Sequence, residues 1–366
     1  MSVQCERLGG VNLSQGVCDL ALPAPVAKAA RDAIDRGQNS YSRHDGTGAL
    51  RMALADSYRR RGLFDLDPES QIVVSAGATG ALYCACLALL EPGDEVILFE
   101  PYYSYHRSTL LATQAKPVFV RTEPPDWSFS MAALEDAVTE RTRAIIVNTP
   151  SNPSGKVWSR EELELVAGFA TRHDLFVFTD EIYEYFIYDD QEHICIGSLP
   201  GMWERTITIS GLSKTFSITG WRIGYAICDA RWAGAIGNFS DLVYVCAPTP
   251  LQHGAAAGLV ELGADYFQML ASKYRAKRER LCSMLDAVGL TPFVPQGAYY
   301  VLADVSSIPG DTSREKAMYL LETVGVACVP GQEFFTGPEG HGMVRFCFAK
   351  EDEVIDDACQ RLEQLR

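Results

Sequence analysis

The chain has 366 residues, of which 47% are hydrophobic and 22% charged, and its formal net charge at pH 7 is −15. These proportions are typical of a globular protein and exclude a disordered, collagen-like or coiled-coil chain. The acidic balance argues against a nucleic-acid-binding surface. No apolar run reaches the roughly 18 residues of a membrane span, and residues 1–7 do not resemble a signal peptide. Eleven cysteines without a C-x-x-C pair predict reduced thiols and a cytoplasmic location.

A short β-branched run followed by a helical stretch recurs through the middle of the chain. Short apolar strands that alternate with helices are typical of a mostly parallel sheet covered on both faces. We therefore predict a large, doubly wound α/β domain over residues 44–250. Its predicted strands are 72–75, 95–99, 116–120, 144–148, 175–179, 206–210 and 224–228.

The two ends of the chain have a different pattern. Residues 1–40 resemble a loop, apart from a helix opened by Pro23 and Pro25, and residues 255–290 are rich in helix formers. We predict that residues 1–43 and 251–366 together form a smaller α+β domain. Its predicted strands lie near 299–303, 326–329 and 344–348, and an acidic stretch at 351–357 predicts the start of a final helix.

Ligands of open α/β sheets bind beyond the carboxyl ends of the strands, and four strand ends in this sequence carry unusual residues. Residues 77–80 (GATG) can hold a phosphate with backbone amides, although a tight turn also explains the glycines. Residues 148–155 (NTPSNPSG) form a rigid loop that can aim an amide at a ligand or serve only as a turn. Asp180 ends a buried strand, where a carboxylate is stable if it pairs with a cation. The alternative interpretation is that Asp180 is the N-cap of a helix.

The fourth strand end, residues 210–224, holds Lys214 and Arg222. Arg222 lies between Gly220 and Gly224, which suits a close bidentate contact with a phosphate. Nearby cations would lower the pKa of Lys214 and allow it to act as an amine nucleophile. A phosphate cradle, an amine, an acid and an amide together indicate the chemistry of pyridoxal phosphate, PLP.

Over essentially its whole length the sequence resembles the class I/II aminotransferases, which are fold-type I PLP enzymes. The resemblance implies a mostly parallel, seven-stranded large domain beside the smaller α+β domain. It also implies PLP as cofactor and a ping-pong transfer of the amino group from an L-amino acid to a 2-oxo acid. The segments that carry it are 213–224 (SKTFSITGWRIG), 148–155 (NTPSNPSG), 180–183 (DEIY) and 344–348 (VRFCF).

The resemblance also implies roles for individual residues. The Schiff-base lysine is Lys214, the partner of the pyridine nitrogen is Asp180, and Tyr183 and Asn152 bond the ring hydroxyl oxygen. Lys214, Asp180 and Tyr183 are therefore the predicted catalytic residues. The phosphate and ring contacts assigned in the same way are Ala78, Thr79 and Arg222 for the phosphate and Tyr103 for stacking on the ring.

Substrate binding and assembly are implied in the same way. Arg345 would clamp the substrate carboxylate with help from Asn152 and the backbone of Gly16. Tyr41 would reach the phosphate in the partner subunit, which implies a homodimer with shared sites. No histidine shows metal-ligand spacing, so we predict no metal, and we expect neither nucleic acid nor membrane as a partner.

Several positions depart from the family pattern or stay open. Gly211 stands where many relatives have a phosphate-binding serine, so either Ser210 or Ser213 could take that part. Cys18 replaces a common proline and could change the pocket wall. Arg43 and His44 lie beside Tyr41 in the sequence. They are either surface groups or residues that contact a substrate side chain across the dimer interface.

Two other classes of function compete with the aminotransferase. A PLP-dependent carbon–sulfur lyase, or a β/γ-eliminating or cyclising enzyme, would use the same residues around the cofactor. A non-catalytic regulatory protein would not need all of them. The amino donor is not identified, but no second arginine is placed for a dicarboxylate, which favours neutral or aromatic substrates.

Overall fold

The computed structural model describes all residues, Met1–Arg366, and its largest sheet has eight strands. This sheet contains all seven strands predicted for the α/β domain, and its centre is parallel. Its second strand in the order below, Ile223–Ile227, is antiparallel to both neighbours. The strand order is β2 (Ile72–Ala76), β9 (Ile223–Ile227), β8 (Thr206–Gly211), β7 (Phe176–Asp180), β6 (Thr142–Asn148), β3 (Glu95–Glu100), β4 (Lys116–Glu123) and β5 (Ser128–Phe129).

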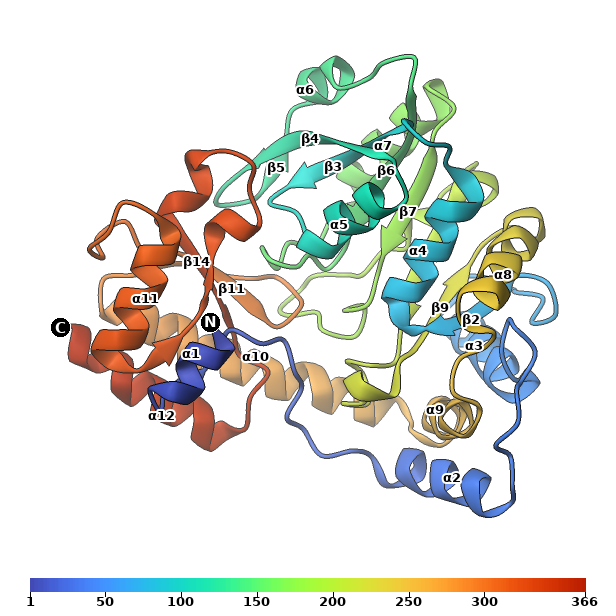
Figure 1. The fold of residues 1–366 in the computed structure, drawn as a ribbon, viewed down its shortest axis with the longest axis horizontal. Coiled ribbons are helices and arrows are strands. Elements are labelled where there is room, and N and C mark those ends of the chain that lie inside the picture. The colour runs from blue at the N-terminus through green and yellow to red at the C-terminus, as the bar shows by residue number, and fades with distance from the viewer.

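Helices cover this sheet, and hydrophobic clusters lie between the helices and the strands. One cluster joins α4 and α8 to the middle strands, and another joins α7 to β3, β6 and β7. Helices on both faces of a mostly parallel sheet confirm the predicted doubly wound class (Figure 1). The helices of this part are α3 (Gly48–Arg60), α4 (Gly77–Leu89), α5 (Ser104–Ala112), α6 (Met131–Asp136), α7 (Arg160–Arg172) and α8 (Ala230–Tyr244).

The C-terminal part contains a four-stranded antiparallel sheet packed with helices, shown in orange and red in Figure 1. A further parallel pair joins the N-terminal segment to it through Val11 and Val326. The strands are β10 (Thr291–Phe293), β11 (Tyr300–Asp304), β14 (Met343–Cys347) and β13 (Val329–Pro330) in that order, with β1 (Val11–Asn12) and β12 (Val326–Ala327) forming the pair. The remaining helices are α1 (Ser2–Arg7), α2 (Ala24–Asp35), α9 (Thr249–Glu261), α10 (Ala264–Ala287), α11 (Ser313–Val324) and α12 (Asp352–Leu362).

The N-terminal segment connects the two parts of the molecule. In Figure 1 it runs in blue from α1, beside the C-terminal sheet, to α2 on the far side. There α2 packs against α9, in a cluster that also contains side chains of β2 and β9. The division of the chain into a large domain of residues 44–250 and a smaller domain of residues 1–43 plus 251–366 remains our proposal. In it, α2 and most of α9 belong to the smaller domain by sequence but pack against the core of the large sheet. None of the helices is both long and apolar enough to cross a membrane.

Candidate active site

A cavity of about 570 Å³ opens beyond the carboxyl ends of β6, β7 and β8 and is closed on one side by β11 and β14. Every site residue predicted from the sequence lines this cavity except Tyr41, whose side chain is exposed. The fold therefore collects residues from position 16 to position 345 into one pocket. The predicted residues that line it are Gly16, Ala78, Thr79, Tyr103, Asn152, Asp180, Tyr183, Lys214, Arg222 and Arg345.

The start of α4 forms one wall of the pocket and presents free backbone amides. Its N-cap residue is Ala76, so no side chain caps the first turn. Gly77 has a φ of +77°, and a Cβ atom there would overlap the guanidinium of Arg222. A Cβ atom on Gly224 would likewise overlap the backbone of Gly77 and Ala78, so β9 approaches the helix start closely. Amides at a helix N-terminus together with a guanidinium suit a phosphate dianion.

Lys214 lies between the wall formed by the start of α4 and the N-terminal segment. Its Nζ donates a hydrogen bond to the carbonyl of Gly16 at 3.1 Å and lies 5.7 Å from the centre of the Tyr299 ring. Burial is the main factor that lowers the pKa of Lys214 from its usual 10.5, and the charges of Arg222 and Arg345 lower it further. A buried amine with a lowered pKa is neutral more often at physiological pH and can act as a nucleophile and a base.

Asp180 ends β7 and is held by two neighbours. The Nε2 of His106, on α5, lies 2.8 Å from its Oδ2, and Asn148 donates to its backbone carbonyl at 3.0 Å. The next residue, Glu181, lies on the opposite face of the sheet, where it accepts from Thr179 at 3.0 Å and contacts His193 at 2.8 Å. Asp180 is thus the carboxylate of this strand that faces the pocket.

Arg345, on β14, is 7% exposed and lies at the opposite wall. Its Nη1 donates to Oδ1 of Asn152 at 2.8 Å, and its Nη2 donates to the carbonyl of Ser14 at 2.9 Å. The guanidinium carbon lies 4.1 Å from the Tyr300 ring centre and 5.0 Å from that of Phe334, and Nε is buried without a partner. Because these contacts include no carboxylate, the charge of Arg345 remains available to an anionic ligand.

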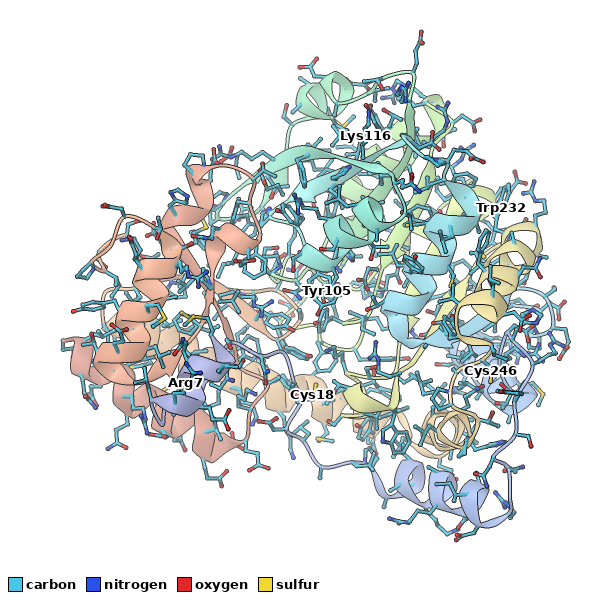
Figure 2. All side chains as sticks on the ribbon, viewed as in Figure 1. Arg7, Cys18, Tyr105, Lys116, Trp232 and Cys246 are labelled. Atoms are coloured by element: carbon cyan, nitrogen blue, oxygen red, sulfur yellow. The ribbon has the colours of Figure 1, made fainter.

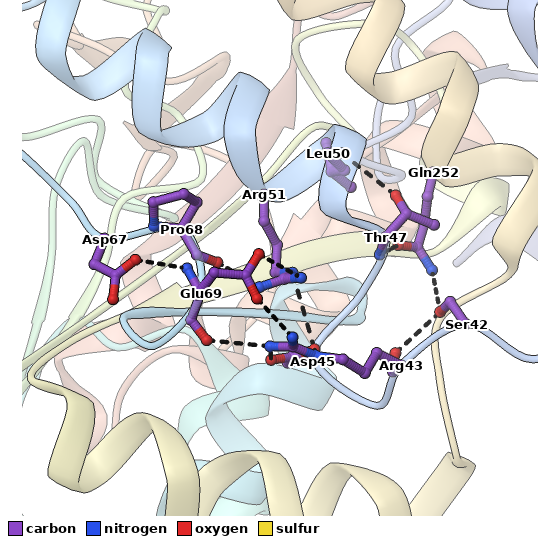
Figure 3. Close-up of polar contacts among 10 residues, drawn as sticks. All are labelled: Ser42, Arg43, Asp45, Thr47, Leu50, Arg51, Asp67, Pro68, Glu69 and Gln252. Atoms are coloured by element: carbon purple, nitrogen blue, oxygen red, sulfur yellow. Dashed lines mark hydrogen bonds and ion pairs between the residues drawn. The ribbon is translucent and has the colours of Figure 1, made fainter.

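The structure shows where several residues lie whose roles the sequence left open. Ser213 lines the pocket, whereas the hydroxyl of Ser210 is buried and donates to Glu184 at 3.0 Å. Cys18, labelled in Figure 2, does not line the pocket and donates to the backbone carbonyl of Lys214 at 3.6 Å. Arg43 forms ion pairs with Asp45 and Glu69 of its own chain (Figure 3).

Sequence reasoning missed several polar groups of the pocket, among them His106 and Tyr300, which contact predicted site residues. His106 follows Tyr103 by three residues, one turn along the start of α5, and that spacing is a signal that could have placed it beside the pocket. Tyr300 shares a 3.1 Å hydrogen bond with the hydroxyl of Tyr183, and burial raises its pKa to about 12, so its hydroxyl stays protonated. The position of Tyr300 depends on a distant strand, and no local motif indicates it.

Comparison with known proteins places the chain in a family. The family described as aminotransferase class I and II matches residues 9–362, so the chain belongs to this family. Kynurenine–oxoglutarate transaminase 3 of Rattus norvegicus is 35% identical over 95% of this chain and 83% of that protein. A probable N-succinyldiaminopimelate aminotransferase of Mycobacterium tuberculosis is 37% identical over 100% of this chain and 94% of that protein.

Solved structures agree with the sequence comparison. The N-succinyldiaminopimelate aminotransferase from Mycobacterium tuberculosis matches with a TM-score of 0.95 at 37% identity, over 100% of this chain and 96% of that chain. YbdL from Escherichia coli, described with a methionine aminotransferase function, matches with a TM-score of 0.95 at 31% identity, over 99% of this chain and 95% of that chain.

The protein is therefore a PLP-dependent aminotransferase of fold type I. The pocket also fits PLP on its own geometry. It offers free amides and a guanidinium for a phosphate, a buried amine for an aldehyde and a carboxylate for a ring nitrogen. These are the kinds of chemical group that the sequence predicts at the strand ends.

Proposed function

We propose that the pocket binds PLP with its phosphate at the start of α4 and with its aldehyde carbon beside Lys214. Ala78, Thr79 and Arg222 would hold the phosphate, with Ser213 as a further hydroxyl at that wall. Tyr103 would stack on the ring, and Tyr183 and Asn152 would bond the ring hydroxyl oxygen. The support is that all these residues line one cavity, although they come from separate elements.

Bound PLP would supply an electrophilic carbon for amine exchange and a ring that draws electrons from the substrate Cα. Lys214 would take a proton from the Cα of the amino donor and deliver it to the carbon that was the aldehyde carbon of PLP, which needs the neutral amine that its lowered pKa favours. Asp180, held by His106, would keep a positive charge on the ring nitrogen. Arg345 would orient the donor through its carboxylate, because its guanidinium is fixed by Asn152 and Ser14.

We propose that the amino donor has a neutral or aromatic side chain. Among the basic residues of the pocket, Lys214, Arg222 and Arg345 already have the roles proposed above. His106 is paired with Asp180. No further cation lines the pocket of one subunit to receive a second carboxylate. The lining instead adds aromatic side chains and one carboxylate, from Tyr105 (labelled in Figure 2), Phe334 and Glu333.

We also propose a homodimer in which Tyr41 serves the neighbouring site. Tyr41 lies outside its own pocket and is 82% exposed. Leu242, Val243 and Val245 are further exposed apolar residues, and the chain beyond them is hydrogen-bonded to Ser40 through Thr249. An exposed aromatic beside exposed apolar residues supports contact with a second copy. Eleven free cysteines, buried except for Cys246, support the proposed cytoplasmic location.

The observation that carries this function is the buried amine of Lys214 in one pocket with Asp180, Arg222 and Arg345. A donor panel tests the substrate class. Purified holoenzyme should convert aromatic and neutral L-amino acids, with a 2-oxo acid as acceptor, at a higher kcat/KM than L-aspartate or L-glutamate as donor. A preference for the acidic donors would show that a second carboxylate site exists and would overturn the proposed substrate class.

A further inference from the structure

Gln252 is fully buried on α9 and does not line the pocket, yet its amide ties two surface segments together. Its Oε1 accepts from the backbone N–H of Thr47 at 2.7 Å. Its Nε2 donates to the hydroxyl of Ser42 at 3.2 Å and to the carbonyl of Ala247 at 2.8 Å. Figure 3 shows the contacts with Ser42 and Thr47. One side chain thus joins residues 42–47 to the loop that follows α8.

The loop after α8 has a strained backbone. Val245 has a φ of 67° and a ψ of −63°, and the N–H of Cys246 bonds the carbonyl of Tyr244 at 2.7 Å. This γ-turn is rare, and its positive φ is least tolerated by β-branched residues such as valine. Neighbouring contacts must hold such a conformation in place, and the bond from Gln252 to Ala247 lies directly beyond the turn.

Residues 40–47 are held along their whole length. The carbonyl of Ser40 accepts from Thr249 at 2.8 Å, and the carbonyl of Asp45 accepts from the N–H of Val74 on β2 at 3.0 Å. Arg43 adds ion pairs with Asp45 and Glu69. Tyr41 lies between the contacts at Ser40 and Ser42, and its own side chain is exposed and has no hydrogen-bond partner in the subunit. The backbone is thereby fixed while the phenol is left free.

We propose that Gln252 is a positioning residue for the site of the partner subunit. It would fix the backbone on either side of Tyr41, so that the phenol reaches the neighbouring phosphate without a loss of loop entropy on binding. This inference rests on the proposed function, because it takes the shared-site dimer as given. It adds that an amide outside both pockets controls cofactor retention, and that it does so in the neighbouring subunit rather than in its own.

Co-expressed heterodimers with two different affinity tags separate the two sites. A subunit with Lys214→Ala has no working site and no Lys214 to link, so activity and the PLP that borohydride fixes on Lys214 both report on the site of the other subunit alone. In the first arrangement Gln252→Leu is placed in the subunit that keeps Lys214. In the second it is placed in the Lys214→Ala subunit, which donates Tyr41 to the working site. The reference pairs a wild-type subunit with a Lys214→Ala subunit.

With a scavenging apoenzyme present, the working site of the second arrangement should release PLP about 5- to 30-fold faster than that of the reference, measured as the loss of PLP that borohydride can fix on Lys214 and as expected for the loss of one or two net hydrogen bonds. The first arrangement should match the reference. Faster release in the first arrangement, or no change in the second, would overturn the inference. A general loss of stability would affect both arrangements alike and would therefore count against it.

Tyr41→Phe in the same two arrangements tests the underlying proposal separately. If Tyr41→Phe accelerates release from the working site only when it is placed in the Lys214→Ala subunit, and Gln252→Leu does not, the shared site stands and the role of Gln252 fails. If Tyr41→Phe has no effect in either arrangement, the shared site itself fails and the inference fails with it. Gln71→Leu is the control, because the side chain of Gln71 accepts one hydrogen bond, from the N–H of Asp67, and forms none with residues 40–47.

A second variant covers the case in which Gln252→Leu does not assemble. Ser42→Ala combined with Thr249→Val removes the side-chain bonds on both sides of Tyr41 at two partly exposed positions. This pair should again accelerate PLP release only when it is in the Lys214→Ala subunit. Equal release from both arrangements would overturn the proposal.

Discussion

The Nε2 of His106 lies 2.8 Å from the Oδ2 of Asp180, although the two residues are 74 positions apart in the chain. Both side chains are buried, one on the first turn of α5 and the other at the end of β7. A carboxylate can only accept, so the imidazole donates through Nε2. The second oxygen of Asp180 accepts from the N–H of Ile182 at 3.3 Å. The orientation of the carboxylate is therefore fixed from both sides before any ligand binds.

His106→Phe should weaken PLP binding and lower kcat. A hydrogen bond to a charged group contributes about 1.5–3 kcal/mol, which corresponds to roughly 10- to 100-fold. Equilibrium titration of apoenzyme with PLP, together with kcat at saturating PLP, measures both effects. His173→Phe is a matched control, because His173 bonds Glu135 at the surface. Equal behaviour of the two variants would mean that His106 does not support Asp180.

Lys214→Ala should abolish turnover while PLP is still retained through its phosphate. General acid–base transfer alone contributes about 10²–10⁴-fold, and the variant also loses the amine. Borohydride treatment of the wild type should link PLP to the peptide that carries Lys214, as peptide mass spectrometry can show. Lys156 is also buried, but its Nζ is bound to Glu162 at 2.6 Å. Label on Lys156 would therefore contradict the proposed role of Lys214.

Arg345→Lys should reduce kcat/KM for the amino donor by about 10- to 100-fold, because an ammonium group cannot form the paired bonds of a guanidinium. The loss should appear mainly in KM, since Arg345 is proposed to bind the carboxylate and not to move a proton. Steady-state kinetics with an amino donor in excess separates the two constants. PLP content should stay normal; a variant purified without cofactor would assign Arg345 to PLP binding instead.

Arg61→Ala should destabilise the fold by about 3–5 kcal/mol at neutral pH, because it leaves the carboxylate of Glu184 buried without its ion-pair partner. Burial alone would raise the pKa of Glu184, but the charges of Arg61 and His193, together with hydrogen bonds from Arg61 and Ser210, outweigh it and hold the pKa below its usual 4.5. This stabilisation is present above pH 4.5 and is lost as the pH falls through the lowered pKa.

Urea unfolding of the wild type and of Arg61→Ala at several pH values measures this effect. The difference in unfolding free energy should be largest near pH 7 and shrink in acid. Arg59→Ala provides the comparison, since its ion pair with Asp56 is exposed and should contribute less than about 1 kcal/mol. A constant difference between the wild type and Arg61→Ala across the acid range would show that the loss is one of packing and not of charge.

The strands of the large sheet could be predicted because each is a short β-branched run next to a helical stretch. The runs predicted at 144–148 and 175–179 correspond to β6 and β7 within one residue at most ends. The sequence pattern did not show β1 and β5, and it joined β12 to β13 as one strand, because a strand of two residues has no periodicity. The helix α1 was also missed, since it is only six residues long and lacks a side-chain cap.

The pocket was predictable where its residues end a strand, as Asp180 does, or follow one closely, as Lys214 does, because parallel strands end at one edge. Tyr300 could not be placed in this way. It stacks on Arg345 from β11, as Phe334 does from the 331–334 turn, and that proximity is decided by how the C-terminal sheet packs. His106 could have been recognised by its distance of one turn from Tyr103.

The opposite orientation of Asp180, the last residue of β7, and of Glu181, the residue after it, has a consequence for protein engineering. Successive residues of a strand face opposite sides, so Asp180 faces the pocket while Glu181 is buried with Thr179 and His193. Deleting or inserting one residue in β7 would move each carboxylate to the opposite face and disrupt both environments at once. Redesign of this enzyme can therefore vary the pocket by substitution at its rim, as at Glu333, but must preserve the length of this strand.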